Sequence, residues 1–564
     1  MTSRRKFIAL LSAGASWAAI ARAATFTGSG VDDQGNTITF TLTETITPAT
    51  LYVAANGNDN NNGKSPSAPF QTIAKINSLV LARGSSVLFN GGDTFTGNLL
   101  PNIDGNGDPN NPVIISSYGT GQATLVAGVG GETGVVNIEQ MSGVTVRNLI
   151  IRGATVPTNM PRGGIRIGNN SATRRTGITI DNCDIGGITY FEATQGGNPS
   201  VQGINGFGIY LAGYPGAGFD VTITNNKVHG LNGPTSHDDV GIGGFGNGSN
   251  IGVTLNNNLV YNIGGGPPGL ASGVGYPPMG DGIAIDGSSG GLVQNCTVHD
   301  CGANYRNPAG GPAGFLSANS RNVKFYRCLA YNIAPSDFSL TQVDFVGFDL
   351  DNDSNGCTID SCYAHDCYNS GFMLFSNGDA SWNNNTVTNC LAENNCRGGL
   401  PRFGEITINL PGASNPTITV QNNTTFNNRV YTGQQFHNDN QGAVGIAITG
   451  GGVFQGTISK NIIVTNVDIY GESTPLNART NTSTFTPAVD ISDNDWWQQS
   501  GGLNIWWANT QYFTLANWQT ASGKGANTQL GNPNFSAPGT GPAGHTQTTF
   551  PGWGATPQSS YGST

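Results

Sequence analysis

A short pattern of apolar and polar residues repeats along the chain from residue 144 onward. It runs apolar, any, polar (usually Asn), Asn or Cys, any, small apolar, often followed by His or Tyr. Alternation over so few residues predicts β-strands with one buried face. The fourth position falls at residues 183, 226, 258, 296, 328, 362, 390, 423 and 461. The intervals vary between 28 and 43 residues, which is typical of a solenoid whose coils differ in loop length.

A second strand is predicted before each of these repeats. Its pattern is Gly-apolar-x-apolar, as in Gly282-Ile283-Ala284-Ile285 and Gly371-Phe372-Met373-Leu374. In one coil Glu405 takes the place of the glycine. We expect these strands to pair in parallel, about 4.8 Å apart, in one sheet.

The fourth position of the repeat is always Asn or Cys. Stacked amides can hydrogen-bond along a ladder, and buried thiols fill the same space as small apolar side chains. We therefore expect a column of unbridged cysteines and asparagines, with Cys301, Cys367 and Cys396 in a second column and Cys357 outside both. Nine cysteines without a CxxC unit argue against a zinc site or a disulfide framework.

The two ends of the chain carry different patterns. Residues 36–43 alternate as a strand, residues 73–82 have helical spacing, and strands follow at 86–89 and 113–116. After Gly471 the chain becomes rich in tryptophan, with a short helix predicted at 515–521. We expect the tryptophans to cap the last coil; the alternative is that they stack on sugars.

This order resembles the secreted right-handed parallel β-helix proteins of the pectate-lyase-like superfamily, in which a short helix covers the first coil. The predicted fold is all-β: a right-handed single-stranded parallel β-helix with an N-terminal helix cap and an aromatic C-terminal cap. We expect a signal peptide at 1–23, a cap and first coils at 24–135, the β-helix at 136–470, and a capping segment and tail at 471–564.

The first residues predict export. Ser3-Arg4-Arg5-Lys6-Phe7-Ile8 is a twin-arginine pattern, and an apolar run with small residues at Ala21 and Ala23 follows. This run is too short to span a membrane and suits cleavage by signal peptidase. We expect a periplasmic or extracellular monomer without a membrane anchor after cleavage.

The amino-acid composition and the net charge exclude some classes of binding partner. The chain has 564 residues, of which 37% are hydrophobic and 10% charged, with a formal net charge of −10. The hydrophobic content argues against disorder, and the negative charge argues against nucleic-acid binding. It also makes a strongly anionic polymer a less natural substrate. The expected partner is an extracellular polysaccharide.

Candidate chemistry centres on the stretch Val346–Asp353, where apolar and acidic residues alternate. On a strand, Phe348 and Leu350 would face the core while Asp349 and Asp351 face outward together. Asp286 occupies the same column as Asp351, and Glu405 lies two coils further along. The candidate catalytic residues are Asp286, Asp349, Asp351, Glu405, His237 and Asp239, and the candidate substrate-binding residues are Asp281, Arg397, Arg402 and Asn409.

Three functions fit this acidic stripe, the outward-facing column formed by Asp286, Asp349, Asp351 and Glu405. Two carboxyl groups can act as acid and base in glycoside hydrolysis, which needs no cofactor. Alternatively, Asp349, Asp351 and Asp353 could bind Ca²⁺ in a polysaccharide lyase whose base is Arg397, Arg402 or Lys324. In the third, the aspartates only cap turns and the protein is a non-catalytic carbohydrate-binding or surface β-helix.

The segment from Gly347 to Phe372 also resembles the catalytic region of alginate C5-epimerases. That family carries a Tyr-Gly-Phe-Asp-Pro-His signature, of which only Asp349 matches a functional residue here; Val346, Leu350 and Asp351 replace the tyrosine, proline and histidine. The resemblance implies the fold and not the epimerase activity. The imidazoles at 229, 299 and 365 share one repeat column with tyrosines 261 and 331, and we expect a structural ladder.

Overall fold

The structure is a computed structural model. It describes residues 25–31, 34–43, 46–128, 131–153, 161–188, 206–214, 218–231, 239–244, 250–265, 280–305, 310–336, 344–398, 403–411, 414–428, 444–450, 453–466, 472–478 and 488–563. The predicted signal peptide, His237 and Arg402 lie outside these residues. Within them, no helix is long and apolar enough to cross a membrane.

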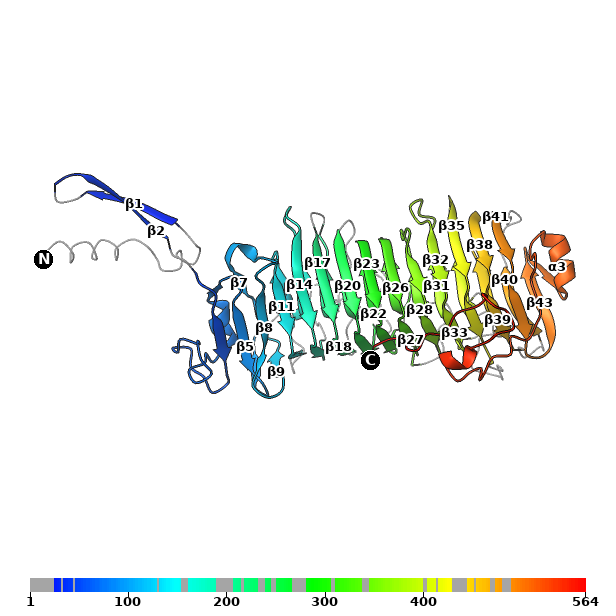
Figure 1. Ribbon diagram of the computed structural model, residues 1–564, viewed down its shortest axis with the longest axis horizontal. Helices are drawn as coiled ribbons and strands as arrows, with labels where there is room; N and C mark the ends of the chain where they lie inside the picture. Colours follow the sequence, from blue (N-terminus) through cyan, green and yellow to red (C-terminus); the bar gives the residue numbers. More distant parts are fainter. Residues whose placement is uncertain are drawn as a thin grey trace, which may run out of the picture.

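Three long sheets run the length of an elongated rod (Figure 1), and in the described part of the chain they contain 13, 14 and 13 strands. Sheet 1 consists of β10 (Gly131–Glu139), β13 (Pro161–Gly168), β16 (Phe207–Ala212), β19 (Val240–Gly244), β22 (Asp281–Asp286), β25 (Ala313–Ala318), β28 (Val346–Leu350), β31 (Phe372–Phe375), β34 (Ile406–Asn409), β37 (Val444–Thr449), β40 (Glu472–Ala478), β43 (Gly502–Trp507) and β44 (Thr510–Tyr512). Only its last pair, β43 and β44, is antiparallel.

The other two long sheets are parallel throughout. Sheet 2 consists of β3 (Thr50–Val53), β5 (Ser86–Asn90), β8 (Val113–Tyr118), β11 (Val144–Arg147), β14 (Arg175–Asp181), β17 (Phe219–Thr224), β20 (Ile251–Asn256), β23 (Ser288–Gln294), β26 (Arg321–Tyr326), β29 (Thr358–Asp360), β32 (Asn385–Thr388), β35 (Ser414–Gln421), β38 (Val453–Ser459) and β41 (Ala488–Ser492). Sheet 3 consists of β6 (Thr94–Thr96), β9 (Ala123–Val126), β12 (Leu149–Arg152), β15 (Asp184–Gly186), β18 (Lys227–Leu231), β21 (Leu259–Ile263), β24 (Thr297–Cys301), β27 (Leu329–Tyr331), β30 (Tyr363–His365), β33 (Leu391–Glu393), β36 (Thr424–Phe426), β39 (Ile462–Thr465) and β42 (Asp495–Gln498).

Each coil contributes one strand to each sheet in turn, so the predicted right-handed parallel β-helix is confirmed. The turn from sheet 2 to sheet 3 explains the polar third position of the repeat. Asn225, Asn257 and Asn295 have φ values of 57°, 57° and 50°, in the left-handed region that asparagine tolerates better than most residues. One such residue turns the chain sharply between two strands.

The predicted column of amides and thiols lies inside the helix, directly after this turn. The side-chain amide of Asn226 donates to Asn258 Oδ1 at 3.0 Å, and Asn423 donates to Asn461 Oδ1 at the same distance. All nine cysteines are free and buried. The second column is corrected at one position, because the backbone amide of Cys367 bonds Asn395 Oδ1 at 3.0 Å, so Asn395 and not Cys396 continues it.

The ends are capped as expected. Helix α2 (Ile73–Asn77) begins at the N-cap Thr72, whose hydroxyl accepts from the backbone of Lys75; it is shorter than predicted, and β4 (Val80–Leu81) follows and pairs with β7 (Asn102–Ile103). At the other end, Trp518 of α3 (Leu515–Ser522) packs against Trp496 with ring centroids 4.9 Å apart. Both indoles are almost fully buried, which supports the capping role.

Four smaller elements and the C-terminal tail complete the described part of the chain. β1 (Thr25–Val31) and β2 (Thr37–Thr43) form an antiparallel pair of their own. Short 3-10 helices span Asp104–Asn106 and Pro542–His545. After α3 the tail returns along sheet 3 and ends beside β24, in the middle of the rod (Figure 1), where the backbone amide of Ser563 bonds Thr297 Oγ1 at 2.7 Å.

Candidate functional site

The outer face of sheet 1 carries a second apolar cluster, separate from the core of the helix. Its members are Phe207, Tyr210, Ala212, Val240, Ala284, Ala313, Leu316, Val346, Met373 and Phe403. Strand alternation places Ala284, Leu316 and Met373 on the outer face, because each adjoins a residue that fills the interior. The interior neighbours are Ile283, Phe315 and Phe372. The predicted acidic stripe is therefore set into an apolar surface.

Asp349 lies in the middle of this apolar cluster. Its register partners are Leu316 on β25 and Met373 on β31, so a large apolar side chain flanks the carboxyl group on each side. Asp349 is 2% exposed, and its Oδ1 has no hydrogen-bond partner among the described residues. A buried carboxyl oxygen without a donor favours the protonated acid.

Asp351 follows two residues later and faces the same side. Unlike Asp349 it keeps part of its surface exposed. Its Oδ1 accepts a hydrogen bond from the backbone amide of Asn352 at 2.6 Å. Neither Asp349 nor Asp351 forms an ion pair with a lysine or arginine in the described ranges.

Further aspartates surround this pair. The acidic cluster consists of Asp281, Asp286, Asp344, Asp349, Asp351 and Asp379. Asp286 pairs with Ala318, the residue beside Asp351, so the predicted shared column of Asp286 and Asp351 is confirmed. Asp344 and Asp379 escaped prediction because they lie outside the strands, on either side of β28 and β31.

The pKa values of the pair are both raised. Burial raises the pKa of Asp349 well above its usual range, and the charges of Asp351, Asp344 and Asp281 add to the shift. Burial also raises the pKa of Asp351, to about 7, against the opposing hydrogen bond from Asn352. Both shifts have burial as their largest cause, and Asp349, whose Oδ1 has no donor among the described residues, is the more enclosed of the two.

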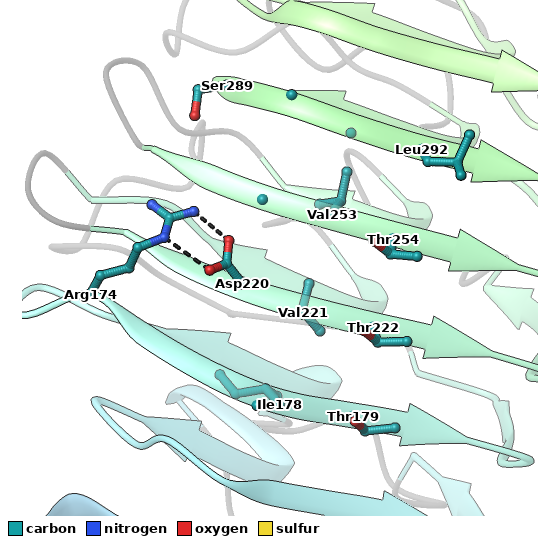
Figure 2. A pocket seen from close by; sticks show the side chains of 14 residues that line it. Arg174, Ile178, Thr179, Asp220, Val221, Thr222, Val253, Thr254, Ser289 and Leu292 are labelled. Carbon is teal, nitrogen blue, oxygen red and sulfur yellow. Dashed lines mark hydrogen bonds and ion pairs between the residues drawn. The ribbon is translucent and has the colours of Figure 1, made fainter. Parts of the chain in front are cut away.

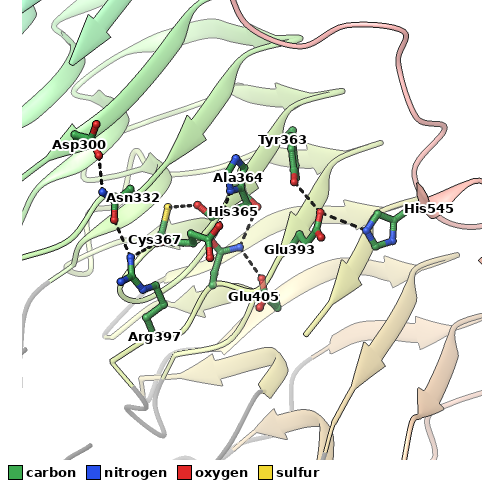
Figure 3. Close-up of polar contacts among 12 residues, drawn as sticks. Asp300, Asn332, Tyr363, Ala364, His365, Cys367, Glu393, Arg397, Glu405 and His545 are labelled. Carbon is green, nitrogen blue, oxygen red and sulfur yellow. Dashed lines mark hydrogen bonds and ion pairs between the residues drawn. The ribbon is translucent and has the colours of Figure 1, made fainter. Parts of the chain in front are cut away.

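Three other predicted acids have different surroundings from those of this pair. Glu405, labelled in Figure 3, does not face outward. It is fully buried, and its two oxygens accept from the side-chain amides of Asn395 at 2.7 Å and Asn427 at 2.8 Å. The strand bends at this position, where other coils have glycine, so the side chain points into the helix. Asp239 is fully buried immediately before β19, and Asp281 is buried with Oδ1 accepting from the backbone of Ala313 at 2.7 Å.

The predicted basic residues that are described serve other contacts. Arg397 donates to Asn332 Oδ1 at 2.7 Å and to the Asp366 carbonyl at 3.1 Å (Figure 3). Lys324 pairs with Asp360 Oδ2 at 2.7 Å on sheet 2. Neither cation contacts the Asp349–Asp351 pair, so a lyase base from these two residues is not supported.

The proposed calcium ligands do not come together as a set. Within the described ranges, no three His, Cys, Asp or Glu side chains are grouped so that they could hold a metal ion. Asp353 has a φ of 54°, and its carboxylate accepts a hydrogen bond from the Ser381 hydroxyl. This residue stabilises a turn, and the residues present do not fit the calcium site.

The predicted imidazole and tyrosine ladder is confirmed on the outer face of sheet 3. The rings of His229, Tyr261, His299, Tyr331 and His365 stack with centroids 4.6 to 5.1 Å apart. Each imidazole also lies within 2.9 Å of an aspartate oxygen. The rings cover one another, which fits a structural ladder.

A groove of about 510 Å³ lies on the outer face of sheet 2 (Figure 2). Arg174 stands at one edge and donates to Asp220 Oδ2 at 3.0 Å, while Thr179, Thr222 and Thr254 form a row along neighbouring strands. The lining contains no other charged side chain, so it offers no acid–base pair. The chemistry of the described residues is concentrated on sheet 1.

One family model and several solved structures are similar to this chain. Residues 217–409 match the family model for the right handed beta helix region. The crystal structure of a GH136 lacto-N-biosidase from Eubacterium ramulus is 16% identical, with a TM-score of 0.47 over 71% of this chain and 68% of that chain. Pectate lyase Pel9A is 16% identical, with a TM-score of 0.35 over 80% and 79% of the two chains. XylC in complex with xylose is 10% identical, with a TM-score of 0.38 over 72% and 83%. The search of curated proteins found no match. With its three parallel sheets and this family match, the chain is a right-handed parallel β-helix protein.

Proposed function

We propose that this protein is an exported glycoside hydrolase that cleaves a neutral polysaccharide with Asp349 and Asp351. The observation that carries the proposal is this pair at the end of β28, with one carboxyl group enclosed by apolar side chains and the other partly exposed. Glycoside hydrolysis needs one carboxyl group that holds its proton and a second that is ionised.

The surroundings assign the two roles. Asp349 lies between Leu316 and Met373, and its buried Oδ1 accepts no hydrogen bond from the described residues, so we assign it as the general acid that protonates the leaving oxygen. Asp351, which is partly exposed, is the base for a water molecule or the nucleophile. The anomeric configuration of the first product distinguishes these two roles of Asp351, because the base mechanism inverts it and the nucleophile mechanism retains it.

The charge around the pair favours a neutral glycan. A uronate polymer would bring carboxylates against Asp349, Asp351 and Asp379, and like charges at close range are costly where burial weakens screening. A lyase would also need a group to neutralise the uronate and a base to remove its proton. Lys324 and Arg397, the described candidates, are held elsewhere.

A non-catalytic role explains the pair less well. A turn-capping aspartate gains hydrogen bonds, as Asp353 does from Ser381. Asp349 instead carries a buried oxygen without a donor in the described ranges, which costs stability and gives the fold nothing in return. Perturbed acids of this kind are enriched at functional sites.

The test is a screen of the purified protein against neutral and uronate polysaccharides for new reducing ends. Asp349→Asn and Asp351→Asn should each lower kcat by about 100-fold or more, the usual contribution of general acid–base groups. Asp360→Asn is the matched control, because Asp360 lies on the same coil but pairs with Lys324 on sheet 2; it should keep full activity. Full activity in both site variants, or an unsaturated product, would contradict the hydrolase proposal.

A further inference from the structure

Beside the acid pair, a strip of neutral side chains continues along the outer face of sheet 1. Phe375 ends β31 one residue after Leu374, which pairs with Leu350, so it lies next to Asp351. Asn409 pairs with Phe375, and Thr449 pairs with Asn409. The order along the rod is therefore carboxylate, aromatic ring, amide and hydroxyl on four consecutive strands.

These side chains are placed to meet a ligand. Phe375 packs on one side against the outer apolar cluster and is only partly buried, which is the geometry of a platform with one free face. Asn409 and Thr449 are also partly exposed. Their side chains have no hydrogen-bond partner among the residues that the structure describes, so their polar groups are available.

The chemistry of the strip matches a sugar chain. Sugar rings have an apolar face of C–H groups that packs on aromatic rings, and hydroxyl edges that bond amides and hydroxyls. Three strand steps separate Asp351 from Thr449, or about 14 Å at the usual strand spacing, which is long enough for more than one sugar ring.

We propose that Phe375, Asn409 and Thr449 form the subsites that hold a neutral glycan along the rod axis, with the ring on Phe375 adjacent to the scissile bond. The inference rests on the proposed hydrolase function and adds the direction of the chain and the residues that determine specificity. Phe375 selects a sugar with an unsubstituted apolar face, and Asn409 reads the hydroxyl groups of the next unit.

The test measures binding separately from cleavage. Cellohexaose, xylohexaose and mannohexaose, with hexagalacturonate as the anionic comparator, are titrated calorimetrically into Asp349→Asn, in which turnover is blocked. At least one neutral hexaose should bind more tightly than hexagalacturonate. Phe375→Ala in this background should weaken that binding by about 10-fold or more, and Phe375→Tyr should restore it.

The matched control is Phe513→Ala, because Phe513 is 59% exposed and lies beyond β44 at the far end of the rod. It should bind as its parent does. In the active enzyme, Phe375→Ala should raise KM for the hexaose and leave the pH profile unchanged, since it does not touch the proton held by Asp349.

The outcomes separate the two proposals. If binding depends on Phe375 but no polysaccharide is cleaved, the hydrolase proposal is rejected and the proposed glycan-binding strip is supported. Cleavage that is unchanged in Phe375→Ala would keep the hydrolase and reject the strip. Tightest binding of hexagalacturonate, or no binding of any neutral hexaose, would overturn the strip as a site for neutral glycans.

Discussion

At the scale of single residues, the same side chain behaves according to its neighbours. Asp349 and Glu393 are both buried carboxylic acids. Asp349 lies between Leu316 and Met373 without a donor to its Oδ1, and its pKa is raised. Glu393 accepts from Tyr363 and pairs with His545, and its pKa is lowered. The surroundings of Asp349 favour the protonated carboxyl group, and those of Glu393 favour the ionised carboxylate.

The first prediction concerns the pH dependence of activity. Because burial raises the pKa of Asp351 to about 7 and raises that of Asp349 well above its usual range, kcat/KM should rise with pH through about 7 as Asp351 ionises. It should fall again at higher pH, when Asp349 loses its proton. Met373→Gln would offer Asp349 a hydrogen-bond donor and should move the alkaline limb to lower pH. An unmoved alkaline limb in this variant would argue against Asp349 as the acid.

The second prediction concerns stability. The pKa of Asp349 is raised in the folded state above the unfolded value of about 3.9, so the folded chain binds its proton more tightly. Its contribution favours folding below about pH 4 and is lost as the pH rises through the folded pKa. Asp349→Asn should therefore raise Tm at pH 8 by about 1–3 °C, with a smaller gain at pH 4. A Tm lowered equally at both pH values would contradict this account.

At the scale of elements, the repeat predicts which face of a strand a side chain occupies and which residues stack between coils. Alternation placed Asp349 and Asp351 on the outer face, and stacking placed Asn226 beside Asn258. Alternation predicted the wrong face for Glu405, because this residue lies at the corner of a coil. At a corner, successive side chains do not point to opposite faces as they do along a strand. Only the neighbouring coils, through Asn395 and Asn427, decide where that side chain goes.

The rest of the site depends on contacts that no repeat encodes. Asp344 and Asp379 lie in connecting segments, so parity along a strand says nothing about them. Phe375 was within reach of the sequence, because it follows Met373 by two residues and shares its face. The apolar character of the outer face could not be read in advance, since alternating apolar residues on both faces give no sign of which side faces solvent.

The third prediction tests the amide ladder. Asn461 is fully buried, and its side chain donates to the Val420 carbonyl and to Asn494 Oδ1, each at 3.0 Å, while it accepts from Asn423. Asn461→Ala leaves several buried groups unsatisfied and should cost about 3 kcal/mol in urea unfolding.

The control is Cys362→Ala at the same position of another coil, where the thiol makes weak contacts such as that to the Asp360 carbonyl at 3.4 Å. It should cost about 1 kcal/mol, the value expected for deleting a small buried group. Equal losses in the two variants would mean that the amides contribute only by filling space.

At the scale of the whole molecule, the C-terminal tail forms hydrogen bonds with coils that are far apart along the rod. It leaves α3, crosses sheet 3 and ends beside β24 (Figure 1). Along this path Ala555 donates its backbone amide to Thr424 Oγ1 at 2.9 Å, and Gly562 donates to the Arg327 carbonyl at 2.8 Å. A solenoid is otherwise stabilised only between neighbouring coils, so the tail adds contacts of long range.

A buried contact between His545 and Glu393 attaches this tail to the rod. His545 is 1% exposed and its Nε2 lies 3.4 Å from Glu393 Oε2 on β33, which also accepts from the Tyr363 hydroxyl at 2.7 Å (Figure 3). The rings of Phe426 and Phe535 lie 5.0 and 4.9 Å from the imidazole. The tail residue is therefore held by its contact with Glu393 and by apolar packing.

The fourth prediction follows from the pKa of Glu393, which is lowered in the fold even though burial alone would raise it, because His545 and Tyr363 bond the carboxylate. A lowered pKa gives stability that is present above the unfolded value of about 4.3 and is lost as the pH falls below it. Glu393→Gln should lower Tm at pH 7, and the difference from wild type should shrink towards pH 3. Limited proteolysis at pH 7 should then cut the variant's tail sooner than the wild-type tail, while the strands of the rod remain protected. The tail of Glu393→Gln could instead resist proteolysis as well as the wild-type tail does. The contact between His545 and Glu393 would then not be what holds the tail, and apolar packing by Phe535 would have to account for its attachment.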